Sequence, residues 1–278
     1  MLLTGGTSGI GRVAAHHLAE RGWCLITVGR DATAGAALEA ATAEAQGSVS
    51  FIQVDLADQS AVRRLADTVR SRVGQLDVLL NNAGLSSSTR VTTPDGVGLT
   101  MAVNHLAPYL LTHELIDRII DADGRVITTA SGLHQRASLD ADDPWFGGSV
   151  SGLDAYARSK LANVAFTIEL AERLPPGPVA NCVHPGFVPG TRLFRDARPW
   201  TRTALRLAEV LPFVGMSEAA GVARLVDLAT NPQYGQYNGT YSAGDGPVSP
   251  ADDAVDPVLR RRLWEESADL VGVDPAWP

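Results

Sequence analysis

The chain has 278 residues, a length that fits one large α/β domain or two smaller ones. Hydrophobic residues make up 45% of the sequence and charged residues 19%, the composition of an ordinary globular protein with a sizeable core. The net charge of −8 offers no basic surface for nucleic acid, and no apolar run reaches the roughly 20 residues that a membrane-spanning helix needs.

The two cysteines, Cys24 and Cys182, lie within apolar runs that are typical of buried strands. We expect both to be reduced core residues rather than the halves of a disulfide. Residues 1–3 lead directly into a glycine-rich stretch, so no signal peptide is predicted. These observations favour a cytoplasmic location, and no metal site is expected.

The first segment predicts a strand, a glycine-rich turn and a helix. Residues 1–4 are apolar, residues 4–11 are rich in glycine, and residues 12–21 have amphipathic helical spacing. Glycines in such a turn let the backbone approach a pyrophosphate, which the N–H groups and dipole at the helix N-terminus then hold. The alternative is a tight turn with no ligand. The residues expected to contact a nucleotide here are Gly5, Thr7, Ser8, Gly9, Ile10 and Gly11.

The end of the second predicted strand, residues 24–28, bears on the choice between NAD and NADP. An NAD site places a carboxylate at this strand end, where it accepts from the ribose 2′-hydroxyl. Gly29 stands there instead, and Arg30 follows with a planar guanidinium suited to a 2′-phosphate. We therefore expect NADP(H) to be preferred over NAD(H), with Arg12 as a second candidate contact. The alternative is that Arg30 is only solvated; Asp31 could cap the next helix in either case.

Two further strands extend the predicted nucleotide site. Residues 49–54 end at Asp55 and Leu56, where the carboxylate could accept from an adenine amino group, although capping the helix from Asp58 is an alternative role. Residues 76–80 form a continuous apolar run, typical of a strand in a parallel sheet. Small residues beside which a cofactor could lie close to the backbone follow this run: Asn82, Ala83 and Gly84.

Strands and helices alternate through residue 129. That alternation predicts a Rossmann-type, doubly wound parallel sheet with helices on both faces. We find no internal repeat and no second domain in the sequence. Residues 1–278 are therefore expected to form a single dinucleotide-binding domain of this α/β class.

Two polar residues of the second half are candidates for the site. Asn104 lies in a predicted helix over residues 98–120, where its alternative role is an amide that bends or caps the helix. Ser131 follows a strand over residues 125–129, which places its hydroxyl at the carboxyl edge of the sheet, where open α/β sheets bind ligands. Residues 132–153 then form an irregular, acidic loop.

Tyr156 and Lys160 are four residues apart in a segment with helical spacing, so they lie on one face of a helix, one turn apart. A phenol has an ordinary pKa near 10 and is a poor acid–base catalyst at neutral pH. An ammonium group one turn away favours the phenolate and lowers that pKa. The alternative is a packed ring beside a solvated charge.

The C-terminal third is predicted to close the domain. A strand over residues 179–183 precedes a turn at residues 184–188, and residues 191–216 form a substrate-side lid segment with apolar and basic residues. A basic helix on a membrane surface and an ordinary solvated helix are the alternatives for this segment. A helix over residues 217–229, a strand over 240–243 and a helix over 257–270 complete the prediction.

These motifs, in this order, resemble those of the classical short-chain dehydrogenase/reductase family over nearly the whole chain. The matching elements are the turn at residues 4–11, Asp55-Leu56, residues 81–84, Asn104, Ser131, Tyr156 with Lys160, and Pro185-Gly186. Residues 103–112, 159–163 and 184–186, together with the long spacing from Ser131 to Tyr156, are similar to the retinol-dehydrogenase-like branch. The N-terminal membrane anchor of its eukaryotic members has no counterpart here, so no integral membrane segment is expected.

The resemblance implies a role for each matching residue. Tyr156 would exchange a proton with a carbonyl or alcohol oxygen that Ser131 also holds. Lys160 would lower the pKa of Tyr156 and hold the nicotinamide ribose, while Asn104 would steady a water that links Lys160 to solvent. Pro185, Gly186 and Val188 would border the nicotinamide, with Thr191 near its carboxamide or the pyrophosphate.

The expected function is therefore an NADP(H)-dependent oxidoreductase acting on a carbonyl/alcohol pair of a small, lipophilic substrate. A reductase of C=C bonds from the same branch and a non-catalytic dinucleotide-binding sensor are the alternatives. Relatives often pair through the helices that carry Asn104 and Tyr156, which makes a homodimer or homotetramer an expectation as well.

Overall fold

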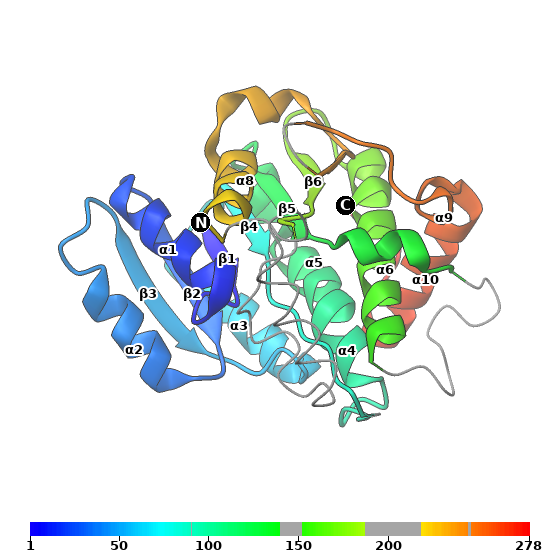
Figure 1. The fold of residues 1–278 in the computed structure, drawn as a ribbon, viewed down its shortest axis with the longest axis horizontal. Helices are drawn as coiled ribbons and strands as arrows, with labels where there is room; N and C mark the ends of the chain where they lie inside the picture. The colour runs from blue at the N-terminus through cyan, green and yellow to red at the C-terminus, as the bar shows by residue number, and fades with distance from the viewer. Residues whose placement is uncertain (90, 140–151, 187–217, 244–245) are drawn as a thin grey trace, which may run out of the picture.

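The computed structural model describes residues 1–89, 91–139, 152–186, 218–243 and 246–278. Its centre is a parallel sheet with the strand order β3-β2-β1-β4-β5-β6-β7 (Figure 1). The strands are β1 (Leu2–Thr4), β2 (Cys24–Gly29), β3 (Ser48–Gln53), β4 (Val78–Asn81), β5 (Arg125–Thr129), β6 (Val179–Val183) and β7 (Tyr241–Ser242). Strands β2 and β3 are added on one side of β1, and strands β5 to β7 on the other side of β4. The boundary between β1 and β4 is therefore the topological switch point, where such sheets bind ligands.

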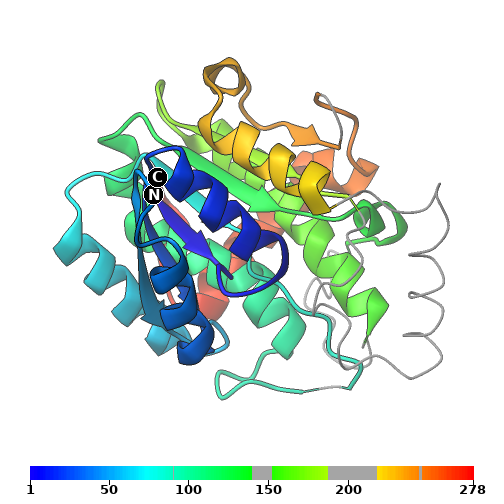
Figure 2. The ribbon, with the colours of Figure 1, turned by 60° about the vertical axis from the view of Figure 1, so that its left-hand side comes forward.

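Helices cover both faces of this sheet. They are α1 (Gly9–Glu20), α2 (Ala32–Ala41), α3 (Gln59–Arg72), α4 (Leu99–Met101), α5 (Ala107–Ile120), α6 (Leu153–Arg173), α8 (Glu218–Thr230), α9 (Asp252–Val255) and α10 (Pro257–Val271). Neighbouring strand residues point to opposite faces, so Leu2 packs with α3, α5 and α6 while Leu3 packs with α1 and α8. Figure 2 shows helices on the two sides of the sheet. The predicted Rossmann-type, doubly wound sheet is confirmed.

Capping residues fix where two of the helices begin. The Asp31 carboxylate accepts from Ala34 N at 3.0 Å at the start of α2, and the Asp58 carboxylate accepts from Ser60 N at 2.8 Å at the start of α3. Each satisfies a backbone N–H that has no partner within the helix. Capping is therefore a confirmed role of Asp31, and Asp58 rather than Asp55 caps α3.

The helix predicted over residues 98–120 is continuous in direction but not in type. It begins as α4, widens to a π-helix over Ala102–Leu106, and continues as α5. Pro108 lacks an N–H group, so it cannot donate to the carbonyl of Asn104 as the α-helical pattern requires. We attribute the local widening to this missing donor; π-turns of this kind are frequent at functional sites.

One core prediction is wrong. Cys24 is exposed, because it is the first residue of β2 and lies at the amino edge of the sheet, whereas Cys182 in the middle of β6 is buried as expected. Both thiols are free. The predicted lid over residues 191–216 lies wholly outside the described residues.

The C-terminal helix α10 packs against α5 and α6 through a cluster of aromatic side chains. Trp264 and Trp277 enclose Tyr109 of α5, with ring centroids 5.1 Å away in each case, and Phe166 of α6 stacks on Trp264 at 5.9 Å. Arg260 of α10 adds ion pairs to two carboxylates of α6. Pairing of two chains through this face of α5 and α6 would therefore require α10 to move.

None of the helices within the described ranges combines the length and the apolarity that crossing a bilayer demands.

Candidate active site

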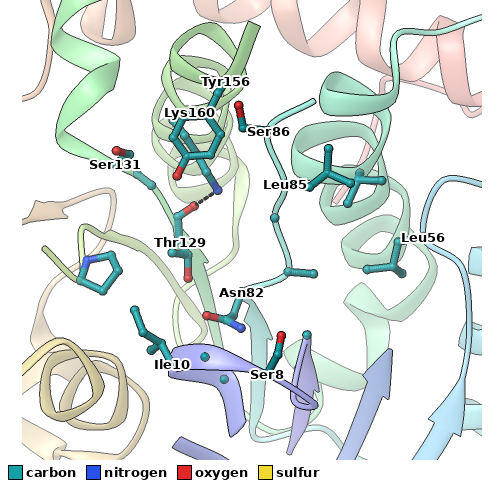
Figure 3. Close-up of a pocket in the computed structure, with 18 of the residues that line it drawn as sticks. Ser8, Ile10, Leu56, Asn82, Leu85, Ser86, Thr129, Ser131, Tyr156 and Lys160 are labelled. Atoms are coloured by element: carbon teal, nitrogen blue, oxygen red, sulfur yellow. Dashed lines mark hydrogen bonds between the residues drawn. The ribbon is translucent and has the colours of Figure 1, made fainter. Parts of the chain in front are cut away.

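A cavity of about 930 Å³ lies at the carboxyl ends of the strands, over the switch point between β1 and β4 (Figure 3). The structure brings most of the predicted site residues to its wall. They are Gly5, Thr7, Ser8, Gly9, Ile10, Gly11, Arg30, Asp55, Leu56, Asn82, Ala83, Gly84, Ser131, Tyr156, Lys160, Pro185 and Gly186. Asn104 stands behind the wall, and Val188 and Thr191 lie outside the described residues.

The glycine-rich turn forms a cradle that has no room for side chains. A Cβ on Gly11 would lie 2.3 Å from the Gly5 carbonyl oxygen, and Gly5 itself has a φ of +73°, which L-residues rarely adopt. Ser8 precedes α1 without capping it through its side chain, so the first N–H groups of the helix are not satisfied by Ser8. The residues present therefore fit the pyrophosphate of a dinucleotide, held by backbone N–H groups and the helix dipole.

Thr4, the first residue of the predicted turn, ties this turn to the end of β4 through contacts that the sequence did not predict. Its hydroxyl oxygen accepts from the backbone N–H groups of Asn82 and Ala83, both at 3.0 Å, and the hydroxyl donates to the Leu80 carbonyl at 3.3 Å. The side-chain amide of Asn82 in turn donates to the Thr4 carbonyl at 2.9 Å. The contact joins residues 78 positions apart, which no local sequence pattern could indicate.

The adenosine end of the cavity contains Gly29, Arg30 and Asp55. A Cβ on Gly29 would lie 2.8 Å from the Thr7 hydroxyl, so Thr7 closes the space that a carboxylate would fill in an NAD site. Arg30 is exposed at the cavity wall, and its backbone carbonyl accepts from Gln53 Nε2 at 3.0 Å. Asp55 lines the cavity, and its Oδ1 accepts from Ala57 N at 3.0 Å.

Tyr156, Lys160 and Ser131 come together where α6 crosses the end of β5 (Figure 3). Only 5% of Tyr156 is exposed, and burial raises its pKa to about 12, while a side-chain hydrogen bond with Ser131 acts in the opposite direction. Lys160 is 2% exposed, and its ammonium donates to the Thr129 carbonyl at 2.7 Å. Burial lowers the pKa of Lys160 to about 8.

Burial thus opposes the effect that the sequence predicts for Lys160. The lysine was expected to lower the pKa of Tyr156, yet the largest influence on the phenol is its removal from water, which disfavours the phenolate. The ammonium lies over the Tyr156 ring, 5.6 Å from its centroid. In the protein without ligands the phenol therefore remains protonated at neutral pH.

Asn104 is held by the backbone of the loop after β4. Its side-chain oxygen accepts from Leu85 N at 2.8 Å, and its amide donates to the Leu85 carbonyl and to the Ser159 hydroxyl, each at 2.9 Å. A Cβ on Gly84 would lie 3.5 Å from the Asn104 oxygen and 3.4 Å from the Lys160 ammonium, so the three residues meet at one point. The side chain acts as a tether between loop, π-helix and α6; the water-steadying role implied by the resemblance stays a prediction.

The rest of the cavity wall consists mainly of residues that were not predicted as site residues. Apolar side chains come from Leu85, Leu99, Val103, Leu133 and Leu153, and polar ones from Ser86, Ser87, Arg136 and His184. Three of them directly adjoin a predicted site residue: Leu85 follows Gly84, Val103 precedes Asn104 and His184 precedes Pro185. This adjacency is the signal that could have found them. Burial lowers the pKa of His184 to about 4, so this imidazole is neutral at physiological pH.

The doubly wound sheet, the glycine cradle and the buried Tyr/Lys pair together define a dinucleotide-dependent oxidoreductase. The chain matches the short chain dehydrogenase family over residues 1–202. It is 34% identical to human (Homo sapiens) retinol dehydrogenase 13 over 284 residues, covering 99% of this chain and 85% of that protein. It is also 34% identical to polyprenol dehydrogenase of Mus musculus over 281 residues, covering 98% and 83%.

Among solved structures, the fold is similar to a short chain dehydrogenase from Burkholderia cenocepacia J2315 in complex with NADP. The TM-score is 0.69 at 29% identity, covering 86% of this chain and 93% of that one. The chain belongs to the short-chain dehydrogenase family and to its retinol-dehydrogenase-like members. The predicted family and the prediction that the protein is an oxidoreductase are confirmed.

Lys160→Met is expected to raise the free energy of unfolding at pH 7 by at least about 1 kcal/mol, while turnover and dinucleotide affinity fall together. The pKa of Lys160 is about 8 in the folded protein against an ordinary 10.5, so folding at pH 7 buries a protonated ammonium at a cost. As the pH rises from about 8 to 10.5 the folded state releases this proton before the unfolded state does, and the cost disappears.

Urea unfolding of both proteins at pH 7 and about pH 9.5 measures the difference. The gain in stability should shrink with rising pH. Tyr156 is present in both proteins, so its own titration enters both stabilities. A gain that grows between the two pH values would show that burial is not what depresses the lysine pKa.

Proposed function

We propose that the protein is an NADP(H)-dependent oxidoreductase that interconverts a carbonyl and an alcohol on a small, lipophilic substrate, with Tyr156 as its acid and base. The observation that carries this proposal is the Tyr156 phenol itself. It is buried at the cavity wall, bonded with Ser131 and one helical turn from Lys160. A hydroxyl pair of this kind can hold one substrate oxygen from two sides and move a proton to or from it.

Each residue has a defined task in this proposal. The bound nicotinamide supplies or accepts the hydride. Ser131 donates a hydrogen bond to the substrate oxygen and fixes its position, while Tyr156 gives that oxygen a proton in reduction or removes one in oxidation. A pKa of about 12 keeps the phenol protonated and ready for the reductive direction. The Lys160 ammonium favours the phenolate left after transfer and would hold the ribose hydroxyls.

Two findings support a lipophilic substrate. The wall beyond Tyr156 carries several leucines and Val103, which bury an apolar body more readily than a polar one. Two of the relatives are named for retinol and for polyprenol, both apolar alcohols. We propose apolar alcohols and the matching carbonyl compounds as the substrate class of this protein, without assigning it either of these two compounds.

The preference for NADP(H) rests on the end of β2. Gly29 offers no carboxylate to a ribose 2′-hydroxyl, and Arg30 places a guanidinium at the wall, where a 2′-phosphate would be bound. A structural relative was solved in complex with NADP. The same reasoning leaves NAD(H) as a weaker ligand of the site.

A screen of cofactor turnover over ketones, aldehydes and enones tests the proposal. Oxidation of NADPH with apolar ketones or aldehydes, yielding alcohols, is the expected result. Consumption of NADPH with enones alone, yielding products saturated at the C=C bond, would replace the proposal by the alternative C=C reductase. No turnover with any of these compounds, and no reduction of NADP by the matching alcohols, would refute it.

A further inference from the structure

A chain of buried polar groups runs from the C-terminal helix to Lys160 through the apolar layer between α5, α6 and α10. Ser267 Oγ lies 2.9 Å from His105 Nε2, and His105 Nδ1 lies 3.3 Å from the Asn163 side-chain oxygen. The Asn163 amide donates to the Thr129 carbonyl at 3.4 Å, the same oxygen that accepts from the Lys160 ammonium at 2.7 Å. Ser267, His105, Asn163 and Lys160 are each at most 2% exposed.

The protons of this chain can be assigned from its two ends. The Thr129 carbonyl can only accept, so Asn163 must present its amide to Thr129 and its oxygen to His105. The imidazole is neutral, because burial lowers the pKa of His105 to about 4, and it therefore carries one N–H. The Asn163 oxygen can only accept, so we place that N–H at Nδ1, and Nε2 is then an acceptor. The single proton of the Ser267 hydroxyl faces two acceptors, the Leu263 carbonyl at 2.6 Å and His105 Nε2 at 2.9 Å.

The carbonyl at the end of this chain occupies a central place in the site. Thr129 is the last residue of β5 and stands two positions before Ser131, while Lys160 and Asn163 lie on adjacent turns of α6. Both α6 side chains bond the same oxygen, so they fix the position of α6 along β5. The distance between Tyr156 and Ser131 depends on that position, since one residue belongs to α6 and the other follows β5.

We propose that Asn163, His105 and Ser267 are positioning residues that hold the Thr129 carbonyl and, through it, the Lys160 ammonium. None of the three lines the described cavity, so they touch neither substrate nor cofactor. The inference rests on the proposed function for what Lys160 does, but not for where Lys160 is held. It gives a task to His105 and Asn163, which lie in the segments that resemble the retinol-dehydrogenase-like branch.

Two amide substitutions of His105, which differ by one methylene group, separate positioning from packing. In His105→Asn the amide nitrogen can replace Nδ1 and still donate to Asn163, whereas in His105→Gln the amide reaches only the Nε2 position. In His105→Asn we expect kcat and the dissociation constant for NADPH to stay within about threefold of wild type. In His105→Gln we expect kcat to fall and the dissociation constant to rise by about tenfold. Asn163→Leu, which keeps the volume, should behave as His105→Gln does, with an unchanged KM for the carbonyl substrate.

Tyr109→Phe is the matched control. It removes a buried hydroxyl one turn from His105 that bonds to the α10 carbonyl of Trp264, but it has no link to Thr129. Melting temperature should fall in this variant while kcat and NADPH affinity stay unchanged. If both His105 variants have equal kcat and NADPH affinity, or if Tyr109→Phe loses activity as Asn163→Leu does, the side chains serve packing only and the proposal is overturned.

Two readouts remain if the wild-type protein turns over none of the screened compounds, a result that would refute the proposed function alone. The NADPH dissociation constants, from fluorescence titration of the full chain, still compare the variants. The ¹⁵N resonances of the His105 imidazole in the wild type report its tautomer without any substitution. We expect the imidazole proton at Nδ1 in the wild type and at Nε2 in Asn163→Leu. A wild-type proton at Nε2 would contradict the proposed series of hydrogen bonds.

Discussion

Tyr156→Phe is expected to lower kcat by at least about 10²-fold, while the dissociation constant for NADPH remains close to that of the wild type. The substitution keeps the ring that packs at the cavity wall and removes the hydroxyl that would exchange a proton with the substrate. The glycine cradle, Thr4 and the Lys160 bond to Thr129 are untouched, so the dinucleotide site should persist.

The loss should appear at every pH at which the wild type is active. With the phenol pKa at about 12, the wild-type hydroxyl is protonated at neutral pH and can act as an acid without prior titration. Phenylalanine has no proton to supply at any pH, so raising or lowering the pH should not restore turnover. Steady-state kinetics with the best compound from the carbonyl screen, from about pH 6 to 9, measures this.

Tyr109→Phe serves again as the comparison, because it removes another buried phenol hydroxyl that lies away from the cavity. A Tyr156→Phe protein that keeps more than about a tenth of wild-type kcat would show that another group, or water, carries the proton. A loss of kcat in a Tyr156→Phe protein that also no longer binds NADPH would instead show damage to the cofactor site.

Local sequence patterns predicted the sheet well because its strands are buried on both faces. The strands at Arg125–Thr129 and Val179–Val183 are confirmed to the residue, since runs rich in β-branched and apolar residues that follow a glycine or proline turn leave few alternatives. The predicted clustering of the glycine turn, Ser131, Tyr156 and Lys160 at one cavity is likewise seen, because parallel strands bring their carboxyl ends to one edge.

What the sequence did not predict depends on contacts between distant residues. Thr4 at the end of β1 bonds to Asn82, which follows the neighbouring strand β4. Ser267 of α10 bonds to His105, which lies 162 positions earlier in the chain. The pKa of Tyr156 was predicted in the wrong direction for the free protein, because the charge of Lys160 is visible in the sequence whereas the burial of both groups is not. Electrostatic effects of this kind become predictable only once the packing is known.

The cofactor preference is the second large effect. Arg30→Ala is expected to reduce the ratio of kcat/KM for NADP(H) over NAD(H) by about one to two powers of ten. Hydrogen bonds to charged groups contribute roughly 1.5–3 kcal/mol, and the guanidinium at the cavity wall would donate to a 2′-phosphate that NAD lacks. Arg21→Ala is the matched control, because it removes an exposed arginine at the far end of α1 that is absent from the described cavity wall.

A carboxylate at Gly29 should carry the change further, but the structure shows that it needs its own control. A Cβ at Gly29 would lie 2.8 Å from the Thr7 hydroxyl oxygen and 3.2 Å from its methyl carbon, so any side chain there must displace Thr7. Gly29→Ala isolates this steric cost, which should weaken both cofactors alike because Thr7 belongs to the turn that holds the shared pyrophosphate.

Gly29→Asp combined with Arg30→Ala should then erase the NADP(H) preference and reverse it. The new carboxylate repels a 2′-phosphate and accepts from a 2′-hydroxyl, so its effect has opposite signs for the two cofactors, whereas the Gly29→Ala effect has one sign. The measurement is the kcat/KM ratio for the two cofactors in wild type, Gly29→Ala, Arg30→Ala, Arg21→Ala and the double variant. Equal use of both cofactors by the wild type, or a ratio that Arg30→Ala leaves unchanged, would remove Arg30 from the cofactor site while leaving the fold and the role of Tyr156 as they stand.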